Sequence, residues 1–223
     1  MEHDSRKIRI VEFNGTPGCG KTTIMKSLAK ELGGGVRFDY YRNRVSRNIN
    51  SVLFSPKYYS LIKLVHKYTN QYPGKKKFSW QLFPAFFIRK YEWFLKDDNS
   101  NLLFVDQGFM QSIISLAYTN KLIESRMLSD IFKISGLDDL PILIINCECD
   151  VETTLNRIKG RKNNGARVHS MTEIEMRNMI ITQIGNFEYV RGIIEKHCRN
   201  VKALTLNTSN EVSYNVNLIK KIL

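Results

Sequence analysis

The eight residues GTPGCGKT, at positions 15–22, constrain the fold of this chain more than any other stretch. Gly15 and Gly20 enclose four residues and are followed by Lys21 and Thr22. Glycines let the backbone turn sharply and approach an anion closely, so that successive N–H groups point into one concavity. In the P-loop pattern that these residues match, the lysine reaches the β- and γ-phosphates of a nucleotide and the hydroxyl contacts its Mg²⁺. The pattern therefore predicts a strand, a phosphate-binding loop and a helix in succession.

The sequence around this loop agrees with that succession. An apolar, β-branched run precedes the loop, and a segment of helix-forming composition follows it. Similar apolar runs recur, and the strands that we expect are residues 8–13, 36–40, 102–105, 141–146 and 201–206. Helix-like segments separate them, at residues 22–32, 58–96, 109–134, 151–159, 172–197 and 211–222. This alternation predicts an α/β fold whose parallel sheet binds ligands at the carboxyl ends of its strands.

The length and charge of the chain set the expected organisation. The 223 residues suffice for a single domain over residues 1–223, in which we expect a basic, aromatic helical region at about 42–98 and a lid at about 157–171. The net charge is +13, and residues 37–96 contain thirteen lysines and arginines but only two acids, Asp39 and Glu92. This region therefore indicates an anionic partner, either a small molecule or a nucleic acid; a solvated basic face is the alternative.

Other features concern the setting of the protein. No run approaches the roughly 18 apolar residues that a membrane span needs, and the four cysteines have neither zinc nor disulfide spacing. We expect a cytoplasmic protein with reduced thiols and no membrane partner, and a homodimer stays open.

A second motif extends the nucleotide site beyond the loop. Asp106 ends the third apolar run, where a carboxylate can hold Mg²⁺ together with Thr22; capping of the following helix is the alternative. The next residue is Gln107, which cannot take a proton from water as the glutamate of an ATPase does. The motif therefore favours transfer to an acceptor over hydrolysis. The loop residues expected to bind the nucleotide are Gly15, Pro17, Gly18, Cys19, Gly20, Lys21, Thr22 and Thr23.

Three arginines follow the fourth apolar run. Arg157 and Arg161 are four residues apart on a predicted helix, and Arg167 lies in the charged stretch that follows. Guanidinium groups near a phosphate site can stabilise the charge that develops during transfer, and a loop that carries them can exclude water. The alternative is a basic helix end that only complements the helix dipole.

These motifs, in the order GTPGCGKT, LLFVDQG, LNRIKGR and LTLNTSNEV, resemble the nucleoside and nucleotide kinase group of P-loop proteins, most of all its thymidylate kinase and deoxynucleoside kinase branch. The resemblance implies a three-layer P-loop NTPase fold with a five-stranded parallel sheet in the order 2-3-1-4-5, flanked by helices. It also implies ATP as donor with Mg²⁺, lid arginines at the transferring phosphate, and Asn207 and Thr208 beside the adenine. The group carries an arginine where this chain has Gln107.

The resemblance places the acceptor beyond the second strand. Asp39 matches the position at which deoxynucleoside kinases carry the base for the acceptor hydroxyl, and a carboxylate there can take that proton. Arg42 and Arg44 can pair with Asp39 or clamp an acceptor phosphate. Gln107 is a further expected acceptor contact.

We therefore expect an ATP-dependent kinase that transfers the γ-phosphate to a nucleoside or nucleotide-like acceptor. The alternative is a nucleic-acid-associated P-loop ATPase, or a kinase of polynucleotide ends, which the basic and aromatic region would serve. The residues expected to take part in catalysis are Lys21, Asp39, Asp106, Arg157, Arg161 and Arg167.

Overall fold

The computed structural model describes residues 7–40, 55–69, 77–96, 102–119, 124–160 and 171–223. Four of the predicted site residues lie outside these ranges: Arg42, Arg44, Arg161 and Arg167.

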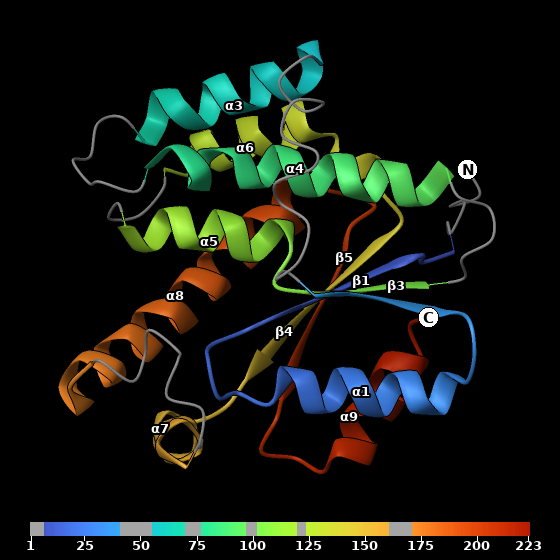
Figure 1. Cartoon of the computed structure of the whole chain (residues 1–223), viewed down its shortest axis with the longest axis vertical. Coiled ribbons are helices and arrows are strands. Elements are labelled where there is room, and N and C mark those ends of the chain that lie inside the picture. The colour runs from blue at the N-terminus through green and yellow to red at the C-terminus, as the bar shows by residue number, and fades with distance from the viewer. Residues whose placement is uncertain (1–6, 41–54, 70–76, 97–101, 120–123, 161–170) are drawn as a thin grey trace.

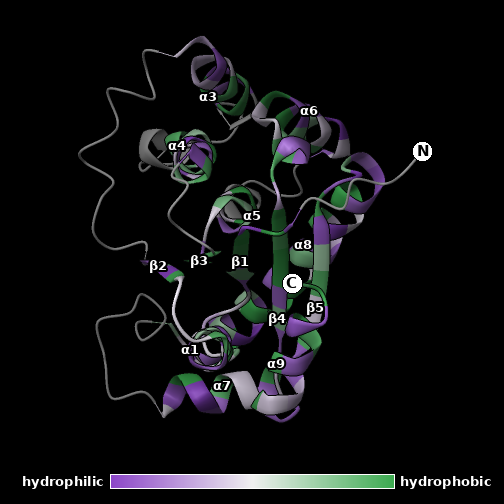
Figure 2. Cartoon of the chain, turned by 90° about the vertical axis from the view of Figure 1, so that its right-hand side faces the viewer, coloured by the Kyte–Doolittle hydropathy of each residue, from purple (hydrophilic) through white to green (hydrophobic). Residues whose placement is uncertain are grey.

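Five parallel strands form one sheet in the order β2-β3-β1-β4-β5, which confirms the predicted α/β class and strand order. The central strand, β1, and its neighbour β4 are almost entirely buried, as expected for a sheet that is covered on both faces. Both consist mainly of hydrophobic residues (Figure 2). The strands are β1 (Ile10–Asn14), β2 (Val36–Tyr40), β3 (Leu102–Asp106), β4 (Ile142–Glu148) and β5 (Lys202–Asn207).

Helices cover both faces of the sheet, so the molecule has three layers, with the sheet between two layers of helices (Figure 1). Helices α1 (Lys21–Leu32) and α9 (Val212–Lys220) pack together on one face. The other face carries most of the remaining helices, with α7 (Val151–Lys159) near the edge of the molecule (Figure 1). The helices of this larger layer are α3 (Pro56–Thr69), α4 (Lys77–Lys96), α5 (Phe109–Thr119), α6 (Ser125–Ser135) and α8 (Glu173–His197).

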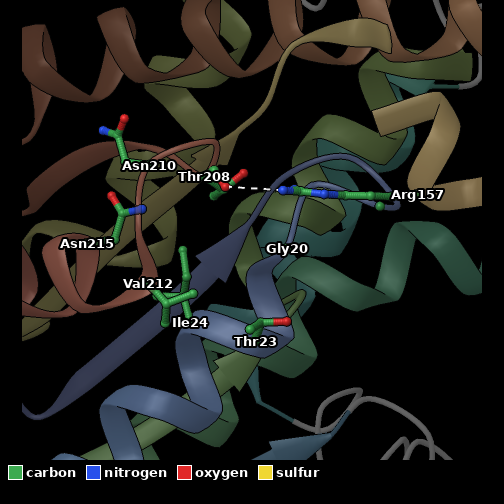
Figure 3. Close-up of a pocket in the computed structure, with 9 residues that line it drawn as sticks. Gly20, Thr23, Ile24, Arg157, Thr208, Asn210, Val212 and Asn215 are labelled. Atoms are coloured by element: carbon green, nitrogen blue, oxygen red, sulfur yellow. Dashed lines mark hydrogen bonds between the residues drawn. The ribbon is translucent and has the colours of Figure 1, made fainter. Parts of the chain in front are cut away.

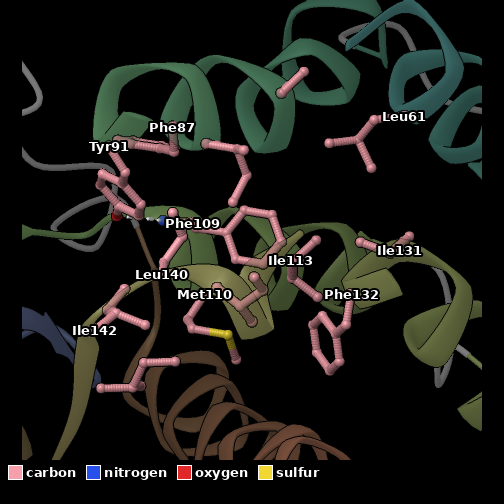
Figure 4. Packing of buried hydrophobic residues seen from close by; sticks show 14 of the residues in the cluster. Leu61, Phe87, Tyr91, Phe109, Met110, Ile113, Ile131, Phe132, Leu140 and Ile142 are labelled. Atoms are coloured by element: carbon pink, nitrogen blue, oxygen red, sulfur yellow. Dashed lines mark hydrogen bonds between the residues drawn. The ribbon is translucent and has the colours of Figure 1, made fainter. Parts of the chain in front are cut away.

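Successive side chains of β1 point to opposite faces of the sheet and so separate the two hydrophobic clusters that pack against it. Val11 and Phe13 point towards α1 and α9, whereas Ile10 points towards the larger helical layer. In that layer Phe109 and Phe132 pack with their ring centroids 6.3 Å apart, among the aliphatic side chains that Figure 4 shows. Burial of this size on both faces fixes the position of each strand, because a slip by one residue would turn every side chain to the wrong face.

The region predicted as one helical segment over residues 109–134 contains two helices, α5 and α6. Gly136 ends α6 with a φ of 67°, and its N–H donates to carbonyl groups of the last turn. The basic, aromatic region likewise contains two helices, α3 and α4, which pack against each other.

Within the described ranges, no helix combines the length and the apolar character that crossing a membrane requires. All four cysteines are buried and unpaired.

Candidate functional site

The phosphate-binding loop lies between the end of β1 and the start of α1, at the carboxyl edge of the sheet. Gly15 has a φ of 141°, and a β-carbon there would lie 2.3 Å from the carbonyl oxygen of Cys147. Any side chain at this position would therefore displace the neighbouring end of β4, which explains why the loop must begin with glycine.

Lys21 begins α1 and turns back over the loop. Its side chain is only 7% exposed, and its Nζ donates to the carbonyl oxygens of Gly15 (3.1 Å) and Thr16 (3.3 Å). Thr22 and Thr23 are exposed at the first turn of the same helix. The loop therefore presents one cation, two hydroxyl groups and the positive end of a helix, as phosphate binding requires.

Asp106 lies at the end of β3, next to the strand that leads into the loop. The register pairs Phe13 with Asp106, which places this carboxyl group beside the loop entrance. Burial raises the pKa of Asp106, and the nearby charge of Lys21 opposes this shift. Among the described residues, none donates a hydrogen bond to its buried Oδ1.

This arrangement fits a magnesium ion. A hard cation prefers oxygen ligands, and Asp106 and the exposed hydroxyl of Thr22 supply them near the phosphates. No cluster of three His, Cys, Asp or Glu side chains suited to a metal occurs in the part of the chain that the structure describes. Asp106 and Thr22 supply only two ligands, and Mg²⁺ bound with nucleotide phosphates typically has one or two carboxylate ligands from the protein.

A pocket of about 320 Å³ continues from the loop towards α9 (Figure 3). Its volume is at the lower end of the range for ligand pockets. Lys21 and Asp106 lie outside its lining, so it suits the base and ribose rather than the terminal phosphates. The residues that line it are Gly18, Gly20, Thr23, Ile24, Arg157, Thr208, Asn210, Val212 and Asn215.

Arg157 closes one side of this pocket. One guanidinium nitrogen donates to the carbonyl oxygen of Cys19 (3.4 Å) and the other to that of Thr208 (3.4 Å), so it joins the loop to the segment after β5. Its helix, α7, is capped by Asp150, whose Oδ1 accepts from the N–H of Thr153 (2.8 Å). Arg157 thus lies where its planar group can contact a nucleotide in the pocket.

The segment after β5 is held in a defined turn. The N–H of Thr208 donates to the carbonyl oxygen of Glu148 (2.7 Å), and its hydroxyl group donates to that of Cys19. The side-chain oxygen of Asn207 accepts from the N–H of Ser209 (2.9 Å). The backbone carbonyl oxygen of Asn207 accepts from the side-chain amide of Asn215 (2.9 Å). Thr208 therefore lines the pocket, whereas Asn207 supports the turn.

The acceptor side begins at the end of β2. Asp39 forms an ion pair with Lys90 of α4, a partner that the sequence did not suggest. Burial lowers the pKa of Lys90 to about 8, and the nearby charge of Arg37 acts in the same direction. Asp39 and Lys90 thus form a charged pair beside the carboxyl edge of the sheet, where an acceptor hydroxyl or phosphate could bind.

Gln107 has an unusual backbone conformation. Its φ is 63°, and no other non-glycine residue among those described has a positive φ. Such conformations cost about 1–3 kcal/mol and concentrate at functional sites. The exposed side chain of Gln107 follows Asp106 directly, so the strain lies at the predicted site.

Comparisons with known proteins agree with this fold. A family model described as "ATPase family associated with various cellular activities" matches residues 11–75, which include the loop and β2. A search of curated proteins found no match. The solved thymidylate kinase of Candida albicans is similar, with a TM-score of 0.56, 14% identity, and coverage of 97% of this chain and 91% of that chain.

The deoxyadenosine kinase of M. mycoides, solved with bound dATP, is also similar. Its TM-score is 0.53, with 15% identity and coverage of 96% of this chain and 97% of that chain. The same enzyme solved with dCMP as product has a TM-score of 0.52 and 16% identity. This chain has the P-loop NTPase fold. At this level of identity the likeness establishes the fold, and the P-loop NTPase fold implies nucleotide binding, typically with Mg²⁺.

Proposed function

We propose that this P-loop NTPase is an ATP-dependent phosphotransferase that phosphorylates a nucleoside or nucleotide-like small molecule. The observation that carries the proposal is the proximity of Lys21 and Asp106 at one sheet edge, where the charge of Lys21 acts on the Asp106 carboxyl group, followed by Gln107 in place of a glutamate. A half-buried carboxylate beside the P-loop lysine suits a magnesium nucleotide. A glutamine cannot take a proton from water, so an acceptor group is the better nucleophile.

On the donor side, some residues bind the phosphates of ATP and others neutralise their negative charge. The loop from Gly15 to Thr23 binds the phosphates, and Thr22 and Asp106 hold the Mg²⁺. This ion neutralises charge on the phosphate oxygens. Arg157 contacts the nucleotide from the side of α7, and Arg161 and Arg167, which lie outside the described residues, complete the proposed lid at 157–171.

Asp39 is proposed as the acceptor base. Its carboxylate takes the proton of the acceptor hydroxyl, whose oxygen forms a bond to the γ-phosphorus while the bond from that phosphorus to ADP breaks. For a nucleotide acceptor, Lys90, Arg42 and Arg44 would instead bind the acceptor phosphate. On this proposal the whole chain acts as one kinase domain.

The experiment is transfer of labelled γ-phosphate from ATP to a panel of nucleosides, nucleoside monophosphates, sugars and short oligonucleotides. We expect a labelled small-molecule product with wild-type protein and none with Lys21→Ala, because the variant loses the cation that contacts the phosphates. Wild-type protein that binds ATP but labels no member of the panel would contradict the kinase proposal.

A second candidate is an ATPase or end-kinase that acts on nucleic acid. The side chain of Trp93 is 58% exposed on α4, and the guanidinium group of Arg37 lies 5.4 Å from its ring centroid. Exposed aromatic side chains among cations suit single-stranded nucleic acid. This candidate requires binding to unspecific DNA that falls steeply with salt concentration, and a labelled oligonucleotide in the transfer panel would favour it.

A further inference from the structure

A buried carboxyl group lies beneath the turn that carries Asp106 and Gln107. Glu12, in the middle of β1, is fully buried only three residues before the first glycine of the loop. One of its carboxyl oxygens accepts a hydrogen bond from the backbone N–H of Met110 (2.8 Å), and the other accepts from the hydroxyl group of Tyr91 (2.9 Å). An acid in the interior is costly unless it is hydrogen-bonded, so both contacts strongly favour this local arrangement.

Tyr91 carries the arrangement across to α4. Its side chain is fully buried, and its hydroxyl oxygen also accepts from the backbone N–H of Phe109 (3.1 Å; Figure 4). The first N–H groups of a helix have no partner within the helix. Glu12 and Tyr91 accept hydrogen bonds from two of these N–H groups in α5, those of Met110 and Phe109. The two side chains thus join β1, α4 and α5 at one point.

The close approach depends on Gly108. A β-carbon at this position would lie 2.1 Å from the Tyr91 hydroxyl oxygen and 2.7 Å from the carboxyl carbon of Glu12. Gly108 directly follows Gln107, whose left-handed conformation turns the chain from β3 into α5, and the N–H of Gln107 donates to the carbonyl oxygen of Phe13 (3.2 Å). The strained turn is thus held from β1 below and from Tyr91 at its side.

We propose that Glu12 and Tyr91 are positioning residues, which hold the turn so that Asp106 faces the Mg²⁺-nucleotide and Gln107 faces the acceptor. The strand that carries Glu12 leads directly into the phosphate-binding loop, so one rigid element sets both the loop and the turn. The part that concerns Gln107 rests on the proposed function, whereas the part that concerns Asp106 requires only nucleotide binding.

The test compares two tyrosine–glutamate pairs in the same protein. Tyr91→Phe removes the hydroxyl group that contacts Glu12 and Phe109. Tyr58→Phe is the matched control, because the Tyr58 hydroxyl donates to Glu92 between α3 and α4, and Tyr58 is also largely buried. For each variant, the affinity for a fluorescent ATP analogue is measured with Mg²⁺ and again with a chelator.

In Tyr91→Phe we expect the gain in affinity that Mg²⁺ provides to fall about threefold to tenfold, the range for one hydrogen bond. The affinity without Mg²⁺ should stay within about twofold of wild type, because the loop itself is unchanged. Tyr58→Phe should match wild type in both measurements. If Tyr91→Phe does not fold, Glu12→Gln replaces it, since it keeps the shape of the side chain and an oxygen that can accept from Met110, whereas its NH₂ group cannot accept from the Tyr91 hydroxyl.

Three results would overturn the proposal: an unchanged gain from Mg²⁺ in the Tyr91 or Glu12 variant, an equal loss of affinity without Mg²⁺, or the same loss in Tyr58→Phe. Wild-type binding that does not respond to Mg²⁺ would overturn it as well. These results are independent of phosphate transfer, so a panel without any labelled product would refute the proposed kinase function and leave this test intact. Where transfer is found, Tyr91→Phe should lower kcat and raise the KM for ATP about threefold to tenfold, in step with the weaker binding of Mg²⁺-ATP.

Discussion

Replacement of Glu12 by glutamine should change how the stability of the protein depends on pH. Burial raises the pKa of Glu12 from its ordinary 4.5 to about 7, although the hydrogen bonds from Tyr91 and Met110 lower it. The folded protein therefore holds this proton at pH values at which the unfolded chain has released it. The contribution of Glu12 to stability is fully present below about pH 4.5 and is lost as the pH rises to about 7.

The size of the effect follows from the shift in pKa. A shift of one unit corresponds to about 1.4 kcal/mol, so a rise from 4.5 to about 7 corresponds to a loss of about 3 kcal/mol across that interval. Glutamine has the same shape and does not titrate. The free energy of unfolding of Glu12→Gln, relative to wild type, should therefore increase by about 3 kcal/mol between pH 4.5 and pH 8.

The assay is urea unfolding of both proteins at intervals of half a pH unit, with circular dichroism as the measure of unfolding. Subtraction of the wild-type curve removes the titration of groups that do not interact with Glu12. Tyr91 does interact with Glu12, but burial and Glu12 raise the pKa of Tyr91 well above its ordinary value of 10.0, so Tyr91 does not titrate in this range. Glu31→Gln, at an exposed residue of α1, is the control for the loss of one acid. A difference between Glu12→Gln and wild type that does not vary with pH would refute the reasoning.

Three further predictions concern the site. Gly15→Ala should abolish ATP binding in equilibrium dialysis, because its β-carbon would lie 2.3 Å from a carbonyl oxygen of β4; binding within twofold of wild type would contradict this. In Asp106→Asn the gain in ATP affinity that Mg²⁺ provides should fall about tenfold in a magnesium titration, and a titration like that of wild type would reassign Asp106 to a structural role. Gln107→Gly should change the melting temperature little, because relief of strain offsets the added freedom of the unfolded chain, while transfer falls at least about tenfold; unchanged transfer would exclude an acceptor role.

The parts of the fold that depend on local pattern could be predicted from the sequence. A buried parallel strand is a continuous apolar run, so the five strands were recognisable, and the glycines with Lys21 placed the loop between the first strand and the first helix. The strand order came from resemblance to a family. The division of residues 109–134 into two helices was missed, because apolar residues continue through α5 and α6 without a proline or glycine between them.

The partners of the site residues could not be predicted, because they depend on how distant helices pack. Nothing in the sequence distinguishes Lys90 from the other twelve lysines and arginines of residues 37–96. Only the packing of α4 beside β2 brings it to Asp39. The pocket residues Val212 and Asn215 belong to α9, whose place beside α1 depends on the whole sheet.

Glu12 illustrates what an apolar pattern conceals. In the run IVEFN it reads as one polar residue in a buried strand, which alternation would allow to face solvent. Both faces of this sheet are covered, so the carboxyl group has to find its partners inside the protein. It finds them in Tyr91, 79 residues away, and Met110, 98 residues away. An acid in a strand that is otherwise buried therefore indicates a specific interior contact, and here that contact lies beneath the turn that carries Asp106 and Gln107.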